Sequence, residues 1–356
     1  MKIHHYGTLW LLLALPLSAV SSQRGAAVTA PGASAAPNAT LKAVSAAKAF
    51  LAALDDRRRV QVSLELNANT RSNWSNLPTG AVFQNGATER NGPRLGDLSA
   101  AQQDAALALV AAALSPAGYQ KVINIVNADQ MLERTSAPSR QAASRVRFGR
   151  AEYHVAILGA PSETQPWMIQ FGGHHLAINI TLAGTRSVLT PSHTGAQPAM
   201  FSLNGQAIRP LGKENDKAFA LINALNAAQQ KQAILQYQVR DVVLGPGHDG
   251  EVIQPEGARA STFSAAQQDM LLDLVSEWVG ILNDDAAAAK MAEIKANLAD
   301  SYFAWSGPTT NGSPAYFRIQ GPTVMIEYAP QGSGTDHIHT FYRDPTNDYG
   351  AKFTKP

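Results

Sequence analysis

One six-residue sequence occurs twice in this chain, each time at the expected start of a helix. Ser-Ala-Ala-Gln-Gln-Asp occupies residues 99–104 and again residues 264–269. Serine is a favoured N-cap residue, and an amphipathic pattern follows in both places. Two further pairs keep the same order, Lys-Ala-Phe at 48–50 and 217–219, and an alternating apolar segment at 167–180 and 315–328. Three matches in one order indicate a tandem duplication.

The duplication determines the expected architecture. Copy one is placed at residues 41–186 and copy two at 211–343, with a Pro-rich connector at 187–210 and a C-terminal tail at 344–356. Each copy combines amphipathic helices with a few strands. We therefore predict an α+β protein in which two helix-and-hairpin units pack about a pseudo-two-fold axis as one body.

The apolar spacing also predicts the individual elements of copy one. Helices are expected at residues 41–59, 100–114 and 119–133, and strands at 60–66, 152–158 and 167–182. Two segments, residues 70–96 and 237–262, have the composition of loops and are long for a compact domain. Long loops are often lids or binding loops, so we expect one of these two roles for both segments.

The N-terminus and the composition limit the class of protein. Residues 1–21 carry a weakly basic start, an apolar run and small residues near the end, and an Ala/Ser/Pro linker follows at 22–40. This pattern predicts an export signal, hence a periplasmic or extracellular protein without a retained membrane anchor. The absence of cysteine excludes disulfides and thiolate metal centres. A net charge of +2 gives no reason to expect nucleic acid as a partner.

Four of the nine histidines occur in two short segments. His174 and His175 follow Gly-Gly inside the predicted strand 167–182, and His337 and His339 form a His-x-His near the C-terminus. Because side chains alternate between the faces of a strand, His337 and His339 should lie side by side. Only one of the adjacent pair can face them, and the alternation favours His175. Copy two lacks this pair, so one composite site is expected.

These histidines could bind a transition metal together with Glu327, which the alternation places opposite the apolar residues of its strand. Such donors suit zinc, iron, copper or manganese. The metal would activate water toward a small-molecule substrate, with Glu327 as ligand or general base and Arg343 as an anchor for an anionic group. Two other interpretations stay open: a secreted protein that binds a ligand or metal without catalysis, and histidines that only form structural hydrogen bonds.

The remaining motifs exclude other functions. His193 and His248 fall in predicted loops and are expected to be exposed, and His154 is expected in the core. There is no glycine-rich phosphate loop followed by Lys-Ser/Thr, and no Gly-x-Ser-x-Gly. Nucleotide binding and a serine hydrolase of that type are therefore not expected.

Several segments together resemble a known family. They are Leu114–Tyr119, Pro166–Trp167 with Gly173–Leu176, Tyr316–Pro322, Glu327–Tyr328, His337–His339, Arg343–Pro345 and Asn347–Gly350. On these residues the chain resembles the domain-of-unknown-function family numbered 3500, over nearly all of the sequence after the linker. Typical members are exported bacterial proteins, which agrees with the N-terminal pattern. The family has no assigned activity, so the resemblance implies no catalytic residues.

Overall fold

The computed structural model describes residues 38–83, 86–136, 145–332 and 334–354. The predicted export signal and nearly all of the linker lie outside these ranges. The described residues form ten α-helices, an eleven-stranded mixed sheet and a separate two-stranded sheet, which confirms the α+β prediction. None of the described helices is long and apolar enough to cross a membrane.

The helices begin where local sequence signals place them. The side chains of Ser99 and Ser264 each accept a hydrogen bond from the backbone N–H three residues later, and the side-chain oxygen of the glutamine at that position accepts one from the serine N–H. The helices are α1 (Asn38–Ala52), α2 (Asp56–Val62), α3 (Ala68–Ser72), α4 (Ala100–Ala113), α5 (Pro116–Thr135), α7 (Gly212–Ala224), α8 (Ala227–Ala233), α9 (Ala265–Val279), α10 (Asp284–Ala296) and α11 (Ala351–Thr354).

The prediction of one helix over 41–59 was wrong. Asp55 caps a new helix by accepting a hydrogen bond from the N–H of Arg58, so α1 ends at Ala52 and α2 starts at Asp56. Because α2 continues to Val62, only two residues of the strand predicted at 60–66 are extended.

The large sheet has the strand order β1-β2-β3-β4-β6-β13-β12-β11-β10-β9, with β5 beside β4. Its strands are β1 (Ser63–Leu64), β2 (His154–Leu158), β3 (Trp167–Gly173), β4 (Leu176–Ala183), β5 (Arg186–Val188), β6 (Ser192–Ala196), β9 (Ala258–Arg259), β10 (Tyr302–Ser306), β11 (Tyr316–Gly321), β12 (Val324–Pro330) and β13 (Ile338–Arg343). Only the β1–β2 pair is parallel among the described pairings. The small sheet pairs β7 (Phe201–Leu203) with β8 (Gln206–Ile208).

The order of strands is symmetric about the β6–β13 pair. Outward from it, β4, β3 and β2 follow on one side, and β12, β11 and β10 on the other, all antiparallel. Two copies of one unit would produce this order. Strand order alone does not establish a common origin, so the duplication stays a prediction.

Two predictions about the middle of the chain were wrong. The single strand at 167–182 is a hairpin, β3 and β4, whose turn is His174–His175. The connector at 187–210 contains β6, which lies at the centre of the sheet. A period-two pattern continues across a short hairpin turn, so alternation could not reveal the reversal.

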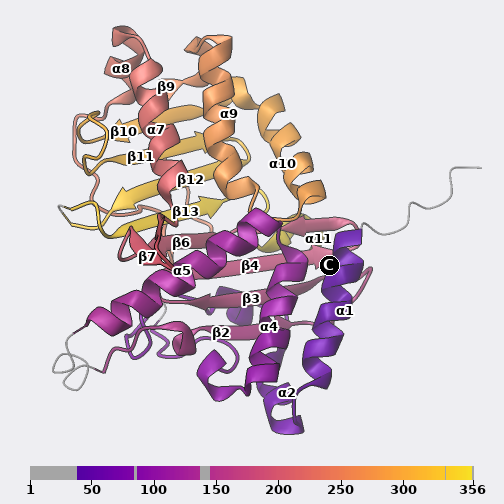
Figure 1. The fold of residues 1–356 in the computed structure, drawn as a ribbon. Helices are drawn as coiled ribbons and strands as arrows, with labels where there is room; N and C mark the ends of the chain where they lie inside the picture. The colour runs from indigo at the N-terminus through magenta and orange to yellow at the C-terminus, as the bar shows by residue number, and fades with distance from the viewer. Residues whose placement is uncertain (1–37, 84–85, 137–144, 333, 355–356) are drawn as a thin grey trace, which may run out of the picture. The chain divides into compact units, whose positions relative to one another are not determined.

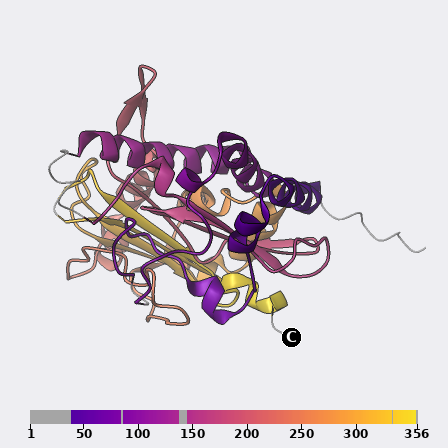
Figure 2. The same cartoon turned by 90° about the horizontal axis from the view of Figure 1, so that it is seen from below.

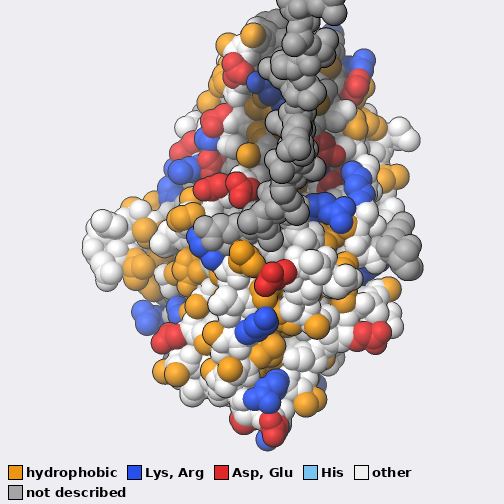
Figure 3. All heavy atoms as spheres, turned by 90° about the vertical axis from the view of Figure 1, so that its right-hand side faces the viewer, with side chains coloured by type: hydrophobic (Ala, Val, Ile, Leu, Met, Phe, Trp, Pro, Cys, Tyr) orange, Lys and Arg blue, Asp and Glu red, His pale blue; other side chains and the backbone are white. Residues whose placement is uncertain are grey.

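The two faces of the sheet differ in what covers them. Helices α1, α4, α5, α7, α9 and α10 lie together on one face of the sheet in Figure 1, and their buried apolar residues form the cores on that face. Two loops cover the opposite face, a first loop (residues 73–83 and 86–94) and a second loop (residues 234–257), seen below the sheet in Figure 2. That face carries polar side chains, among them Gln170, Arg318 and Glu327, which bond to these loops. On the outer surface drawn in Figure 3, acidic and basic side chains are interspersed with apolar ones.

Candidate metal centre

The histidines meet where the two halves of the sheet join. In the β6–β13 pair, His339 lies opposite Gly195 and Phe341 opposite His193. Directly opposed residues of neighbouring strands point to the same face, here the polar face under the loops. The β3–β4 turn ends beside β6, because the N–H of Gly195 donates to the carbonyl oxygen of His175 at 2.7 Å. Segments about 160 residues apart in sequence thus reach one place.

His175 has an unusual backbone conformation that aims its ring. Its φ is +64°, in the left-handed region that non-glycine residues seldom occupy. Two long-range hydrogen bonds hold it there: its N–H donates to the carbonyl oxygen of Asn76 in the first loop, and its carbonyl accepts from Gly195. Strain of this kind persists only where the surroundings enforce it, and it is concentrated at functional sites. The turn therefore presents His175 to the neighbouring strands.

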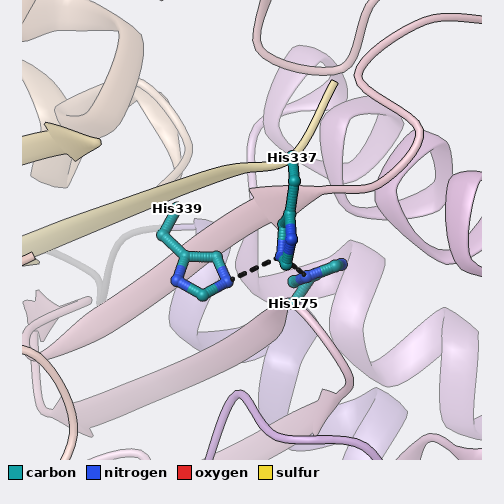
Figure 4. A group of neighbouring side chains, drawn as sticks. All are labelled: His175, His337 and His339. Carbon is teal, nitrogen blue, oxygen red and sulfur yellow. Dashed lines mark hydrogen bonds between the residues drawn. The ribbon is translucent and has the colours of Figure 1, made fainter. Parts of the chain in front are cut away.

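Three imidazole rings come together with their Nε2 atoms closest to one another. Nε2 of His337 lies 2.8 Å from Nε2 of His175 and 3.2 Å from Nε2 of His339 (Figure 4). The ring planes of His337 cross those of His175 and His339 at 66° and 84°. A nitrogen lone pair lies in the plane of its ring, and the short Nε2–Nε2 distances bring the lone-pair positions of the three rings close together. This group of three could hold a metal ion.

The surroundings keep two of these rings, those of His175 and His337, neutral. Burial, and then the neighbouring imidazoles, hold the pKa of His175 well below its usual value. For His337, burial and the proximity of His339 lower the pKa to about 4. Neutral imidazole is the form that binds metals. Since a ring nitrogen carries at most one hydrogen, two separate good hydrogen bonds cannot form around Nε2 of His337, whereas a cation accepts all three lone pairs.

Asp241 of the second loop orients one ring of this group. Its Oδ1 lies 3.3 Å from Nδ1 of His339, which places the hydrogen on Nδ1 and leaves Nε2 as the lone-pair nitrogen. Burial alone would raise the pKa of Asp241, but the interactions with His339, with the N–H of Val242 and with the side chain of Gln331 together outweigh it, and the pKa lies below the usual value. A carboxylate on the far nitrogen is the usual arrangement around metal-binding histidines.

A second group overlaps the first but is built differently. Asp129 of α5 accepts from Nδ1 of His174 at 2.7 Å and from the N–H of Gly149 at 2.8 Å. His174 is stacked on His175, with ring centroids 3.6 Å apart and planes 30° apart. Asp129, His174 and His175 also lie close enough to hold a metal. Stacked rings direct their lone pairs side by side instead of to one point, so we assign Asp129 and His174 a supporting role behind His175.

Strand alternation was the wrong argument for separating His174 from His175. Both residues form the turn, where alternation does not apply, and both are buried. His175, favoured over its neighbour, is the one that contacts His337.

The expectation that His193 is exposed was also wrong. His193 is a residue of β6 and is completely buried, with its ring 5.0 Å from that of His339. Pro191 and Gly195 on either side gave this short strand the composition of a loop. Asp129 was missed too, although its spacing from Val122, Ile125 and Val126 places it on the buried stripe of α5.

Glu327 and Arg343 do not join the histidine group. The carboxylate of Glu327 accepts from the N–H groups of Val243 and Leu244, both at 2.8 Å, and from the hydroxyl of Tyr316 at 2.7 Å. Arg343 donates to Asp348 and to the carbonyl oxygen of His248. Both residues therefore attach the second loop to the sheet. His248 is half-buried, with 45% of its side chain exposed, and bonds to Glu251; His154 is mostly buried, its Nδ1 2.9 Å from the carbonyl oxygen of Gly92.

Comparison with known proteins identifies a family without naming an activity. No curated protein and no solved structure matches the chain. The family described as "Protein of unknown function (DUF3500)" matches residues 37–351, which include every histidine of the site. Since the match covers most of the sequence, the chain belongs to this family.

Proposed function

We propose that the protein is a metalloenzyme in which His175, His337 and His339 hold one divalent transition-metal ion. The observation that carries the proposal is the convergence of their Nε2 atoms, 2.8 Å and 3.2 Å apart. In a tetrahedral zinc site, nitrogens at about 2.05 Å from the metal lie roughly 3.3 Å from one another. A small outward adjustment of the His175–His337 pair would therefore make room for zinc.

Three protein ligands leave one coordination position free, which is typical of catalytic rather than structural zinc sites. His175 and His339 are buried, while His337 is half-buried and lies next to exposed residues, so solvent approaches from its side. A water at the free position would lose a proton near neutral pH and become a nucleophile. We propose a hydrolytic reaction on a small molecule. Imidazole also suits copper, nickel and iron, so the metal has to be measured.

Metal binding without catalysis is the second candidate. It is favoured by the gathering of His174 and His193 around the same three rings, which provides more imidazoles than one hydrolytic metal requires. A binding protein would hold the metal without accelerating any reaction. Comparison of metal-depleted and zinc-restored protein on ester, phosphoester and amide substrates separates the two.

The N-terminal pattern supports a role outside the cytoplasm. An apolar run over residues 9–17, followed by small residues, is typical of a cleaved export signal. We propose that the mature chain is exported. Mass spectrometry of the N-terminus recovered from a periplasmic fraction tests this, and an intact residue 1 there would contradict cleavage.

Elemental analysis of protein purified without a histidine tag tests the metal site. We expect about one equivalent of transition metal per chain, and its loss in His175→Ala, His337→Ala and His339→Ala. The matched control is His248→Ala, because this histidine lies outside the group. If no metal copurifies and none binds at micromolar concentration, the proposal is wrong. If metal binds but the three variants retain it, the ligand assignment is wrong.

A further inference from the structure

His193 is a buried histidine without a hydrogen-bond partner among the described residues. It is completely buried, and neither Nδ1 nor Nε2 has a partner there. A neutral imidazole carries one donor and one acceptor, and leaving such buried polar atoms without a partner destabilises the fold. Burial and the neighbouring imidazoles hold the pKa of His193 well below its usual value, so protonation does not explain its placement.

The missing side chain of Gly195 shows which way His193 points. A Cβ at Gly195 would lie 3.2 Å from Nε2 of His193 and 3.3 Å from Cβ of His175. Gly195 lies directly opposite His339 in the β6–β13 pair. Nε2 of His193 therefore extends along β6 over Gly195, toward the space between His175 and His339. A glycine at this position gives the ring room to do so.

His193 nevertheless stands outside the ligand group. Among the described residues, the ligand atoms of His175, His337 and His339 all lie within 4.8 Å of one another, and His193 belongs to no such group. Its ring faces His339 edge-on at 73°, with centroids 5.0 Å apart. His193 thus contacts the ring of the ligand His339 without belonging to the group of ligands. From there a side chain reaches a molecule bound to the metal more readily than the metal itself.

We propose that His193 hydrogen-bonds through Nε2 to the non-protein ligand at the free coordination position of the metal. That ligand is a water, a small anion or the oxyanion of a bound substrate. The inference rests on the proposed metal site and adds the residue that binds and orients what the metal holds. It makes His193 a positioning residue whose orphaned nitrogen is satisfied by the bound ligand.

The test uses cobalt-substituted protein and azide as the probe. Azide binding is followed by the cobalt absorption spectrum in the wild type, His193→Leu and His193→Gln. We expect His193→Leu to retain its cobalt but to bind azide about tenfold more weakly, the effect of one lost hydrogen bond to a charged partner. His193→Gln keeps a donor and should recover most of the affinity. His154→Gln is the matched control, because this histidine lies on the same sheet but bonds to Gly92 instead.

Two results would overturn the inference. If both His193 variants bind azide as the wild type does, His193 does not touch the ligand. If both lose cobalt while near-ultraviolet circular dichroism shows a native fold, His193 is a metal ligand. Should His193→Leu fail to fold, His193→Phe takes its place as the variant without a donor; weaker azide binding in it supports the inference, and unchanged binding refutes it. A wild type that binds no cobalt or zinc refutes the metal site itself, and this inference with it.

Discussion

The contact between Asp241 and His339 predicts a measurable loss of metal affinity when the carboxylate is removed. Asp241→Ala takes away the acceptor that keeps the hydrogen on Nδ1 of His339. The ring can then carry its hydrogen on Nε2, which is the nitrogen that must bind the metal. Removing such a partner commonly costs 10- to 100-fold in affinity, as an order of magnitude.

The structure places the effect near the lower end of that range. The Nδ1–Oδ1 distance is 3.3 Å, longer than the roughly 2.7–2.9 Å of a strong charge-assisted bond, and 53% of the Asp241 side chain is exposed. We therefore expect Asp241→Ala to weaken zinc binding about tenfold, equivalent to about 1.4 kcal/mol. Asp241→Asn keeps an acceptor oxygen and should weaken it less, by about threefold.

Competition against a chromophoric chelator at fixed pH and salt measures these affinities. Asp336→Asn is the matched control, since it removes the same charge from an exposed residue next to His337 whose carboxylate bonds to the N–H of Ala199 instead. If Asp336→Asn weakens zinc binding as much as Asp241→Asn does, general charge explains the effect. Unchanged affinity in Asp241→Ala would refute the orienting role.

Three further predictions concern the framework of the site. Lys121→Met should destabilise the fold by about 3 kcal/mol, because it leaves the completely buried carboxylate of Glu214 without its ion-pair partner, as urea unfolding would show. Burial lowers the pKa of His154 from 6.5 to about 4, so between these pH values the unfolded chain binds a proton that the folded chain does not. The wild type therefore loses stability as the pH falls from 6.5 to 4. His154→Gln removes this proton uptake and should lose less stability over the same pH range. Glu327→Gln replaces one of the two oxygens that accept from backbone N–H groups of the second loop with an NH2 donor, so one of these bonds is lost and hydrogen exchange there should rise.

Each of these has its own control. Lys213→Met changes an exposed lysine next to Glu214, and an equal loss of stability there would show that the ion pair is not responsible. Denaturant titrations of metal-free protein at several pH values test His154→Gln, which must match the wild type above pH 6.5. For Glu327→Gln the first loop serves as internal reference, and faster exchange in both loops would indicate general destabilisation.

Features that depend on neighbours in sequence could be predicted. The starts of α4 and α9 could be recognised because each begins with a serine followed three residues later by a glutamine. These two residues cap the helix through bonds within its first turn, so no distant residue is needed. The loops were recognised by composition, and the His-x-His segment by the spacing of two residues on one strand. These contacts need no knowledge of the rest of the chain.

Features that depend on strand pairing could not be predicted from the sequence. The turn at His174–His175 keeps the alternating pattern of its strands, so the sequence shows no break there. The central place of β6 comes from its pairing with β4 and β13, and β13 lies far away in the sequence. For this reason His193 was assigned to a loop.

By itself, the sequence determined the α+β class, the starts of α4 and α9, and the two segments that carry His174, His175, His337 and His339. Only the tertiary structure decided how they are used. Asp129 of a helix bonds to His174, and Asp241 of a loop bonds to His339. Glu327 and Arg343 instead attach the second loop to the sheet. The physical reason is that local propensity acts over a few residues, whereas a site assembled across the β6–β13 pair depends on register between distant strands.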